Sequence, residues 1–505
     1  MKRMNAIYCC CISNVWIKTA EYLVNECNIE PKYFVGWKGD LPLNKHSDVL
    51  RNCFTQYVED AWRGIGFPSY VDSTIECLDE PVIASYSHEI SVGIKMIDRL
   101  DPTGEMFPFT ERYFWFLGLV EKWLRVIETE DIEVVISPSI PHRVFDYALY
   151  IAARIKSVRF VMFQMTPFSD KSFIIDDVNS TCSYMKEAIS SNQFTEKTLD
   201  SDIQNRLNLL LSSYEDAVPD YMIKQKKESK ISNRISSKIS KLKKLPSVFG
   251  VANTYSIIKK SQPSYGKVSK LKYNYSLLKG EHYKHRLKNK YAEAVTSSMP
   301  RRRDGDQYYL VALHYQPEET SCPTGGVYVE QRQIVKLLCE VTPPDFKVYV
   351  KEHSSQFHPN MEGEAGRSEN YYDDLLKISE KVVLIGVEED TFGLIDNALA
   401  TVTVSGTIGW ESVFRGSPAI VFGRAWYEDM AGVFKVKSKS DLKAAVSLIN
   451  EDGVDISHDK LISYHKKLSD FLISASHYKA TADKGITGVE DSAINISKAV
   501  AKYLN

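Results

Sequence analysis

The 505-residue chain contains no hydrophobic run that approaches the ~20 residues a transmembrane helix needs. Its most apolar window, Tyr113–Val120, stops at Glu121 and Lys122. An apolar run near the start, Ala6–Ile12, is short and no small-residue cleavage site follows it, so a secretory signal is not indicated. We expect this run to be the first strand of the fold and the protein to be cytoplasmic.

Cysteine motifs and strong charge of one sign are also missing. The nine cysteines lack the spacings of a disulfide framework or a zinc site. Cys9, Cys10 and Cys11 fall in the predicted first strand, where cysteine serves as a small hydrophobe, and this usage is typical of a reducing compartment. The net charge is only −2, so a protein that binds nucleic acid through its overall charge is not indicated.

Several catalytic motifs are absent as well. No GxGxxG follows the first predicted strand and no GxxxxGK[ST] occurs, which disfavours a dinucleotide enzyme and a P-loop ATPase. The sequence around Gly409 is not the GxSxG of a hydrolase, because Trp410 and Glu411 stand where that motif needs its serine. No DxD spacing in the chain is convincing as a metal site, so we expect metal-independent chemistry without a cofactor.

The first part of the chain alternates strands with helices. A chain of this length is too long for one ordinary core, so two or three domains are expected. The predicted strands are Ala6–Ile12, Lys32–Trp37, Pro81–Tyr86, Ile132–Pro138 and Arg159–Gln164, and the predicted helices are Val15–Cys27, Glu111–Glu128 and Phe145–Ser157. This alternation predicts βαβ units on a parallel sheet, in a first domain over residues 1–194.

The pattern changes over residues 195–304, which read as a helical insert. Within it, residues 224–245 carry nine Lys or Arg and one Glu, while Ile231, Ile235 and Ile239 recur at helical spacing. A cationic helix with a narrow apolar stripe could lie on an anionic membrane surface. The alternative is a solvated linker helix or loop.

The alternating pattern returns in a second α/β unit over residues 305–490, and a terminal helix (residues 491–505) follows it. The predicted strands are Tyr308–Tyr315, Phe346–His353, Val382–Gly386, Val402–Val404 and Pro418–Phe422, and the predicted helices are Val329–Val341, 371–379, 391–398 and Ser492–Leu504. The fold class is therefore α/β, with two doubly wound domains facing a cleft. In open parallel sheets, ligands bind beyond the carboxyl ends of the strands.

The unusual polar residues of the second unit all follow such strand ends. They occupy three stretches, His314–Glu318, Lys351–His353 and Ser405–Glu411. Because the carboxyl ends of parallel strands share one edge of the sheet, we expect these stretches to face one crevice.

Ser405, Gly406 and Thr407 stand between a strand and a predicted helix. A helix start offers unpaired backbone N–H groups and the positive end of the dipole, which together bind anions such as phosphate. Glu411, one turn later, would face the same ligand and could accept hydrogen bonds from ribose hydroxyls. The alternative is an ordinary helix cap, with Glu411 placed favourably near the helix start.

Two further groups could act in the same crevice. Lys351 and His353 alternate along a strand end, so both could contact a phosphate. The alternatives are that Lys351 pairs with a surface carboxylate and that His353 is an ordinary loop histidine. Glu318 and Glu319 follow Pro317, and carboxylates in a cleft can serve as nucleophile, general base or metal ligand. Solvated acids in a loop are the alternative.

Three motifs together resemble a known family. "HYQPEET" with a following "GG", "YVKEH", and "TVSGTIGWES" with "PAIVFG" are similar to the bacterial capsule polysaccharide or surface-carbohydrate biosynthesis family, related to transferases that use CMP-activated Kdo, an eight-carbon acidic sugar. The resemblance covers about Tyr308–Tyr427 and extends to the first domain only in architecture.

The resemblance implies a GT-B fold, in which the C-terminal Rossmann-like domain binds the nucleotide sugar and the acceptor faces the N-terminal one. Carried over, Lys351 and His353 would contact the donor phosphate, as would Ser405, Gly406 and Thr407. Glu411 would bind the ribose. Gln316 and Glu318 would lie at the transferring sugar, with Glu318 as the candidate catalytic carboxylate.

We therefore expect a glycosyltransferase that moves Kdo or another acidic sugar, from a CMP donor, onto a cell-surface polysaccharide or lipopolysaccharide. Its partners would be the nucleotide sugar and a glycan or lipid-linked glycan, with inner-membrane contact through residues 224–245 and no nucleic acid. The acceptor base should come from the first domain, where His142 or Asp146 follows a strand. The alternatives are a transferase that uses a nucleoside diphosphate sugar, a nucleotide-sugar epimerase of the same fold, and a non-catalytic assembly partner.

Overall fold

A computed structural model describes most of the chain. The described residues are 3–36, 47–73, 77–101, 104, 106–180, 186, 198–212, 214, 270–358, 361–451, 453–478 and 485–504. The basic segment at residues 224–245, for which we predict membrane contact, lies outside them. Among the described residues, no helix is both long and apolar enough to span a membrane.

Seven strands form the first sheet, in the order β13-β6-β5-β4-β1-β2-β3. They are β1 (Met4–Tyr8), β2 (Ile29–Gly36), β3 (Phe54–Tyr57), β4 (Ile132–Ser137), β5 (Arg159–Met165), β6 (Lys171–Ile175) and β13 (Ile473–Ser474). The strands from β3 to β5 run parallel, β6 pairs antiparallel with β5, and β13 pairs antiparallel with β6. The order β3-β2-β1-β4-β5 is that of a doubly wound sheet, as the sequence predicts.

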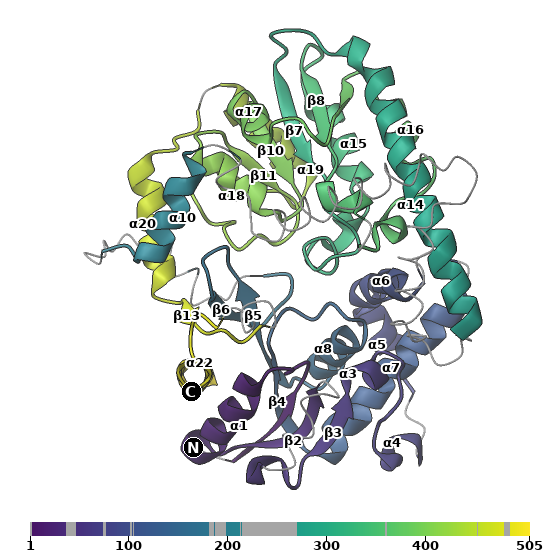
Figure 1. Cartoon of the computed structure of the whole chain (residues 1–505), viewed down its shortest axis with the longest axis vertical. Helices are drawn as coiled ribbons and strands as arrows, with labels where there is room; N and C mark the ends of the chain where they lie inside the picture. The colour runs from purple at the N-terminus through teal and green to yellow at the C-terminus, as the bar shows by residue number, and fades with distance from the viewer. Residues whose placement is uncertain are drawn as a thin grey trace, which may run out of the picture.

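Helices cover both faces of this sheet (Figure 1). The helices of this domain are α1 (Asn14–Cys27), α3 (Val58–Ala61), α4 (Ser69–Ser73), α5 (Glu80–Ser85), α6 (Ser87–Met96), α7 (Phe109–Thr129) and α8 (Phe145–Ile155), with the 3-10 turns η1 (Asp48–Leu50) and η2 (Ile97–Leu100). Helix α10 (Ser201–Leu210) instead contacts α18 (Thr407–Phe414) of the second domain (Figure 1). Helix α8 is buried almost throughout, because nine of its residues face the core between α7 and the sheet.

The second sheet is entirely parallel and has the order β12-β11-β10-β7-β8-β9. Its strands are β7 (Tyr308–Ala312), β8 (Lys347–Lys351), β9 (Val382–Ile385), β10 (Ala400–Thr403), β11 (Ala419–Val421) and β12 (Val433–Lys435). The chain moves outward from β7 to β9 and then returns to β10 on the other side. This reversal between β7 and β10 is the switch point at which open α/β sheets bind ligands.

The helices of the second domain pack on both faces of its sheet, and α14 runs along one side of the molecule (Figure 1). They are α14 (Lys270–Ser298), α15 (Arg332–Val341), α16 (Tyr371–Ile378), α17 (Thr391–Asp396), α18 (Thr407–Phe414), α19 (Lys439–Asn450) and α20 (His458–Ser469), with 3-10 turns η3 (Met299–Arg301), η4 (Gly326–Val329), η5 (Ser354–Phe357) and η6 (Gly363–Gly366). Two doubly wound domains confirm the predicted α/β fold class and its GT-B architecture.

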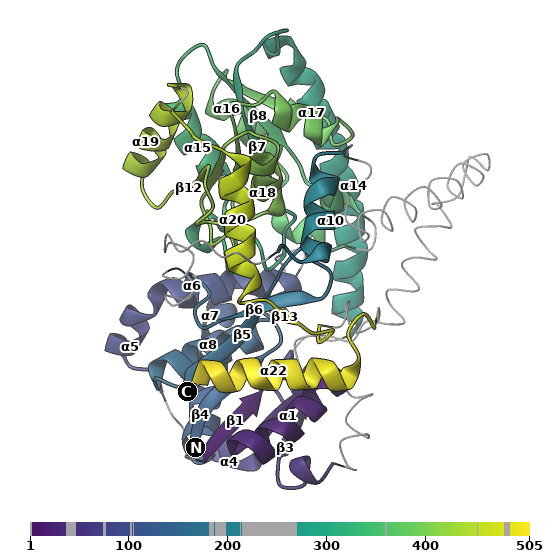
Figure 2. The ribbon, with the colours of Figure 1, turned by 90° about the vertical axis from the view of Figure 1, so that its left-hand side faces the viewer.

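The chain crosses back to the first domain at its end. After α20, strand β13 pairs with β6, and helix α22 (Val489–Leu504) packs along α1 (Figure 2). Strand β13 falls within residues 305–490, which we expected to belong wholly to the second domain. Its register pairs Ile473 with Ser172 and Ser474 with Lys171, so these two residues complete the edge of the first sheet instead.

Two local predictions need correction. Residues Pro81–Tyr86, predicted as a strand, lie mostly in helix α5. The Asp79 side chain accepts a hydrogen bond from the Val82 amide at 3.2 Å and Pro81 occupies the first turn, and these features start a helix despite the apolar run. Strand β1 ends at Tyr8, so Cys9–Cys11 follow the strand, although all three are buried.

Candidate active site

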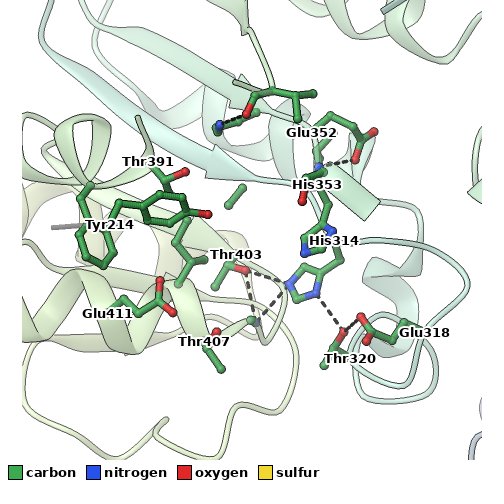
Figure 3. A pocket seen from close by; sticks show the side chains of 18 residues that line it. Tyr214, His314, Glu318, Thr320, Glu352, His353, Thr391, Thr403, Thr407 and Glu411 are labelled. Carbon is green, nitrogen blue, oxygen red and sulfur yellow. Dashed lines mark hydrogen bonds between the residues drawn. The ribbon is translucent and has the colours of Figure 1, made fainter. Parts of the chain in front are cut away.

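A cavity of about 220 Å³ lies at the switch point of the second sheet. Segments that follow β7, β8, β9 and β10 form its walls, together with the starts of α17 and α18 (Figure 3). Six of the predicted site residues line it: Glu318, Lys351, His353, Gly406, Thr407 and Glu411. The three polar strand ends therefore meet at one cavity, as the sequence predicts.

His314 holds the floor of this cavity together. Its Nε2 accepts hydrogen bonds from the backbone amides of Ser405 and Gly406, both at 3.2 Å, and lies 2.9 Å from Thr403 Oγ1. The proton therefore sits on Nδ1, which donates to Thr320 Oγ1 at 3.2 Å. Burial lowers the pKa of His314 to about 3, so the ring is neutral.

The His314 contacts extend to the candidate catalytic carboxylate. Thr320 Oγ1 accepts from His314 and donates to Glu318 Oε2 at 2.9 Å. Figure 3 shows this chain of hydrogen bonds from Thr403 through His314 to Glu318. Glu318 is exposed toward the cavity, so its second carboxylate oxygen can reach a ligand while the first is held in place.

Contrary to the prediction, the backbone amides of Ser405 and Gly406 are not available to bind a phosphate. Both donate to His314, and Ser405 Oγ donates to the Thr320 carbonyl at 2.7 Å. A Cβ at Gly406 would lie 3.0 Å from His314 Cε1, so glycine is needed for this close approach. The physical reason is that a buried imidazole nitrogen must find donors, and these two amides supply them.

The start of α18 still offers an anion site, but this site begins after Ser405. Gly406, Thr407 and Ile408 line the cavity, and the positive end of the helix dipole points into it. Glu411 lies one turn further on and faces the same space. Burial raises the pKa of Glu411, while Arg206, a hydrogen bond from Thr407 and Arg415 oppose that shift.

Lys351 lies in the cavity wall, but its ammonium group holds the loop after β9. Lys351 Nζ donates to the carbonyls of Val387 at 2.6 Å and Glu389 at 2.9 Å, and it lies 3.4 Å from the Gly386 carbonyl. An ammonium has three donors. The geometry therefore makes Lys351 a support of the cavity wall rather than a direct phosphate ligand.

His353 keeps a donor for a ligand, and its predicted contact with the donor phosphate stays a prediction. Its Nδ1 accepts from the Ser355 amide at 3.1 Å, which caps η5, so the proton sits on Nε2. Burial lowers the pKa of His353, and the neutral ring lines the cavity. A neutral imidazole in this tautomer presents one N–H donor to the cavity.

Gln316 does not line the cavity, although the sequence placed it at the transferring sugar. Its amide oxygen accepts from Arg367 at 2.6 Å, and its amide nitrogen donates to the Val329 carbonyl at 2.7 Å. Arg367 also forms a bidentate pair with Glu352, at 2.8 and 3.0 Å, and both side chains are 0% exposed. Gln316 thus belongs to the buried network that fixes the loops after β7 and β8.

His142, the predicted acceptor base of the first domain, does not line the cavity but contacts Glu319 in the loop after β7. His142 Nδ1 lies 2.6 Å from the Ile140 carbonyl and 3.3 Å from Glu319 Oε2. The proton on Nδ1 therefore leaves Nε2 as the acceptor. Burial lowers the pKa of His142 well below its ordinary value, with Arg143 acting in the same direction. The other candidate, Asp146, is fully buried and accepts a hydrogen bond from the Arg143 amide at 2.6 Å. Its carboxylate therefore stabilises the loop before α8.

Glu319 gives a prediction of pH dependence. Burial raises its pKa to about 7, so between pH 4.5 and 7 the folded chain keeps a proton that the unfolded chain releases. Stability must therefore fall as the pH rises through this range. Relative to Glu319→Gln, we expect the free energy of unfolding of the wild type to drop by about 2–3 kcal/mol between pH 4 and pH 8. Chemical denaturation at both pH values measures this, and a constant difference between the two proteins would contradict it.

Sequence patterns did not reveal several residues that shape the site. Tyr214 and Phe392 form an edge-to-face pair on the cavity wall, with ring centroids 5.1 Å apart, although they are far apart in the chain. Thr320 and Thr403 become important only through His314. The one available signal was that His314 opens a polar stretch at the end of an apolar strand.

Metal ligands do not gather anywhere in the part of the chain that the structure describes. No group of three or more His, Cys, Asp or Glu side chains is placed there to hold a metal ion. Metal independence of the reaction stays a prediction.

Comparison with known proteins finds a family match in the second half of the chain. Residues 215–447, just under half of the chain, match the family model described as capsule polysaccharide biosynthesis protein. This segment contains the whole cavity except Tyr214, and its match confirms the resemblance carried by the motifs. No curated protein matches the chain.

Solved structures give only distant similarity. The beta Kdo 2,7 transferase KpsC of Thermosulfurimonas dismutans is 10% identical over 76% of this chain and 90% of its own, with a TM-score of 0.32. The UDP-GlcNAc 2-epimerase of Neisseria meningitidis is 11% identical over 99% of this chain and 100% of its own, with a TM-score of 0.22. Because the sequence identities and TM-scores are this low, the fold is assigned from the topology of the two sheets.

Proposed function

We propose that the chain is a glycosyltransferase that moves a sugar from a nucleotide donor onto a cell-surface polysaccharide or lipopolysaccharide. The observation that carries this proposal is the cavity at the switch point, where polar groups from several strand ends converge. The family match over residues 215–447 supports the link to polysaccharide biosynthesis. The motif resemblance favours a CMP-linked donor and Kdo or another acidic sugar.

The cavity offers a distinct partner for each part of a nucleotide. The phosphate would lie at the start of α18, near Thr407 and the Nε2–H donor of His353. Glu411 would accept hydrogen bonds from the ribose. The rings of Tyr214 and Phe392 would form the apolar wall for the base.

The sugar would project toward Glu318 and the first domain. In this arrangement an acceptor hydroxyl attacks the anomeric carbon, and the nucleotide leaves with its phosphate stabilised by the helix start and His353. Glu318, held by Thr320, is the candidate catalytic carboxylate. His142, neutral and with Nε2 as acceptor, is the candidate acceptor base. The protein would work at the inner membrane face, with residues 224–245 as the contact.

Thermal unfolding in the presence of CMP, UDP and GDP tests the nucleotide site. A ligand at 100 times its dissociation constant should stabilise the chain by about 2.7 kcal/mol. We expect His353→Asn to weaken nucleotide binding about tenfold, because asparagine can still cap the Ser355 amide but lacks the distal donor. His285→Asn, an exposed position on α14, is the matched control. Absence of stabilisation by all three nucleotides would contradict the proposal.

Product analysis separates the alternatives. A transferase consumes its donor sugar only when the acceptor glycan is present. An epimerase converts the nucleotide sugar without any acceptor. A chain that binds nucleotide and does neither would be a non-catalytic partner of the polysaccharide machinery.

A further inference from the structure

Helix α10 leads the chain to the wall of the cavity at the switch point. The start of α10 is tied to the first domain, because Lys171 of β6 forms an ion pair with Asp200 at 3.2 Å. Its body contacts α18 of the second domain. Tyr214 comes shortly after the end of α10 and lines the cavity. Figure 3 shows Tyr214 on the side of the cavity that holds Glu411, away from Glu318.

Arg415, which directly follows α18, holds the end of α10 in place. Its Nη1 donates to the carbonyls of Leu210 at 2.7 Å and Ser212 at 3.3 Å. The last carbonyls of a helix have no partner within the helix and carry the negative end of its dipole, so a guanidinium stabilises them. Arg415 is fixed in turn by Asp396 at the end of α17, which accepts from Nε at 2.6 Å and from Nη2 at 2.5 Å. Arg415 therefore joins the ends of three helices.

The same guanidinium lies against the aromatic wall of the cavity. Arg415 Cζ is 4.2 Å from the centre of the Phe392 ring, which is a cation–π contact. The Phe392 ring makes the edge-to-face contact with Tyr214 described above. Phe392 is 3% exposed, whereas Tyr214 is only partly buried. Tyr214 is thus the ring of this wall that a ligand can cover, and Arg415 contacts both of its supports, the end of α10 and Phe392.

We propose that Arg415 is a positioning residue for the nucleobase, because it holds the end of α10 and Phe392 so that the Tyr214 ring stacks on the base. This inference rests on the proposed function, which places the phosphate at the start of α18 and the sugar toward Glu318. The base then extends to the opposite side of the cavity, where Tyr214 lies. Every nucleobase has a π-face that can stack on an aromatic ring. Tyr214 therefore contributes affinity for a base rather than choice among bases.

Calorimetric titration of the full chain with CMP, UMP, GMP and ribose 5-phosphate tests the inference. Ribose 5-phosphate carries the same sugar and phosphate without a base. We expect at least one of the three nucleotides to bind about tenfold more tightly than ribose 5-phosphate, within the range for stacking of one base on an aromatic side chain. Tyr214→Ala and Arg415→Met should each remove most of this difference. Both variants should keep the wild-type affinity for ribose 5-phosphate, which shows that they are folded and retain the phosphate site.

The double variant separates a positioning role from an independent contribution. If Arg415 acts through Tyr214, then Arg415→Met should not weaken nucleotide binding further in a chain that already carries Tyr214→Ala. Arg154→Met is the matched control and should bind every probe like the wild type. Arg154, in α8 of the first domain, also forms an ion pair, with Asp177 at 3.0 Å, and stacks on Tyr150 at 5.7 Å.

The other outcomes overturn either the inference or the proposed function. Equal affinity of the wild type for the nucleotides and ribose 5-phosphate would overturn the inference alone. So would additive losses in the double variant, or wild-type nucleotide affinity in Arg415→Met. A loss of ribose 5-phosphate binding in Arg415→Met would assign Arg415 to general support of the fold and would also overturn the inference. If the wild type binds none of the four probes, the proposed function is overturned, and the inference with it.

Discussion

Glu318→Gln is expected to lower the rate of sugar transfer by about 10²–10⁴-fold, the range for loss of a catalytic acid or base. Glu318 is the carboxylate that lines the cavity and is oriented by Thr320. The amide keeps the size of the side chain and can still accept from Thr320, but it cannot take a proton or act as a nucleophile. Nucleotide binding should be unchanged. Release of nucleotide from the donor, in the presence of acceptor glycan, measures the rate.

Two further variants make this result specific. Thr320→Val removes the hydrogen bond that orients Glu318 and should reduce the rate about tenfold, as expected for one lost hydrogen bond to a charged group. Glu380→Gln, whose side chain is 85% exposed on the surface, should leave the rate unchanged. A Glu318→Gln variant with the wild-type rate would remove Glu318 from the mechanism and would favour the non-catalytic alternative.

Arg367→Ala should lower the free energy of unfolding by about 3–5 kcal/mol, because it leaves the buried Glu352 carboxylate without its partner. Glu352 also accepts from Tyr372 at 2.8 Å, and Arg367 stacks over Tyr371 at 4.5 Å. Loss of the arginine therefore disrupts the support of the loops after β7 and β8. Chemical denaturation measures the change, and nucleotide binding should weaken with it.

Arg332→Ala is the matched control for this prediction. Arg332 stacks over the same Tyr371 ring at 4.9 Å and forms ion pairs with Glu330 and Asp374, but its side chain is 28% exposed. Partly exposed ion pairs contribute about 0–1 kcal/mol, so this variant should cost far less. Equal losses in the two variants would show that stacking on Tyr371, rather than the buried ion pair, is the stabilising contact.

Strands with long apolar runs were predicted well from the sequence. The predicted strands Lys32–Trp37, Ile132–Pro138 and Val382–Gly386 overlap β2, β4 and β9 closely, since a buried parallel strand needs a continuous apolar run and nothing else. Strand β13 has only two residues, and no local pattern marks it. It exists because β6 offers a free edge to which the returning chain can pair.

The candidate site was predictable in its position but not in its contacts. Its position follows from polar residues at the ends of parallel strands, a local signal. Its contacts depend on partners that are distant in sequence. His314 meets the Ser405 and Gly406 amides 91 and 92 positions away, and Lys351 meets carbonyls more than 30 positions away. Those contacts turned two predicted phosphate ligands, Lys351 and Ser405, into supports of the cavity.

The sequence by itself determined that the chain is an α/β protein with polar chemistry at the strand ends of its second domain, because hydrophobic periodicity and strand-end residues are local properties. Only the tertiary structure decided which of those groups remain available to bind a ligand. Buried donors and acceptors must be paired, and the folded chain pairs those of Gln316, Lys351 and Ser405 internally. It leaves Glu318 and His353 facing the cavity.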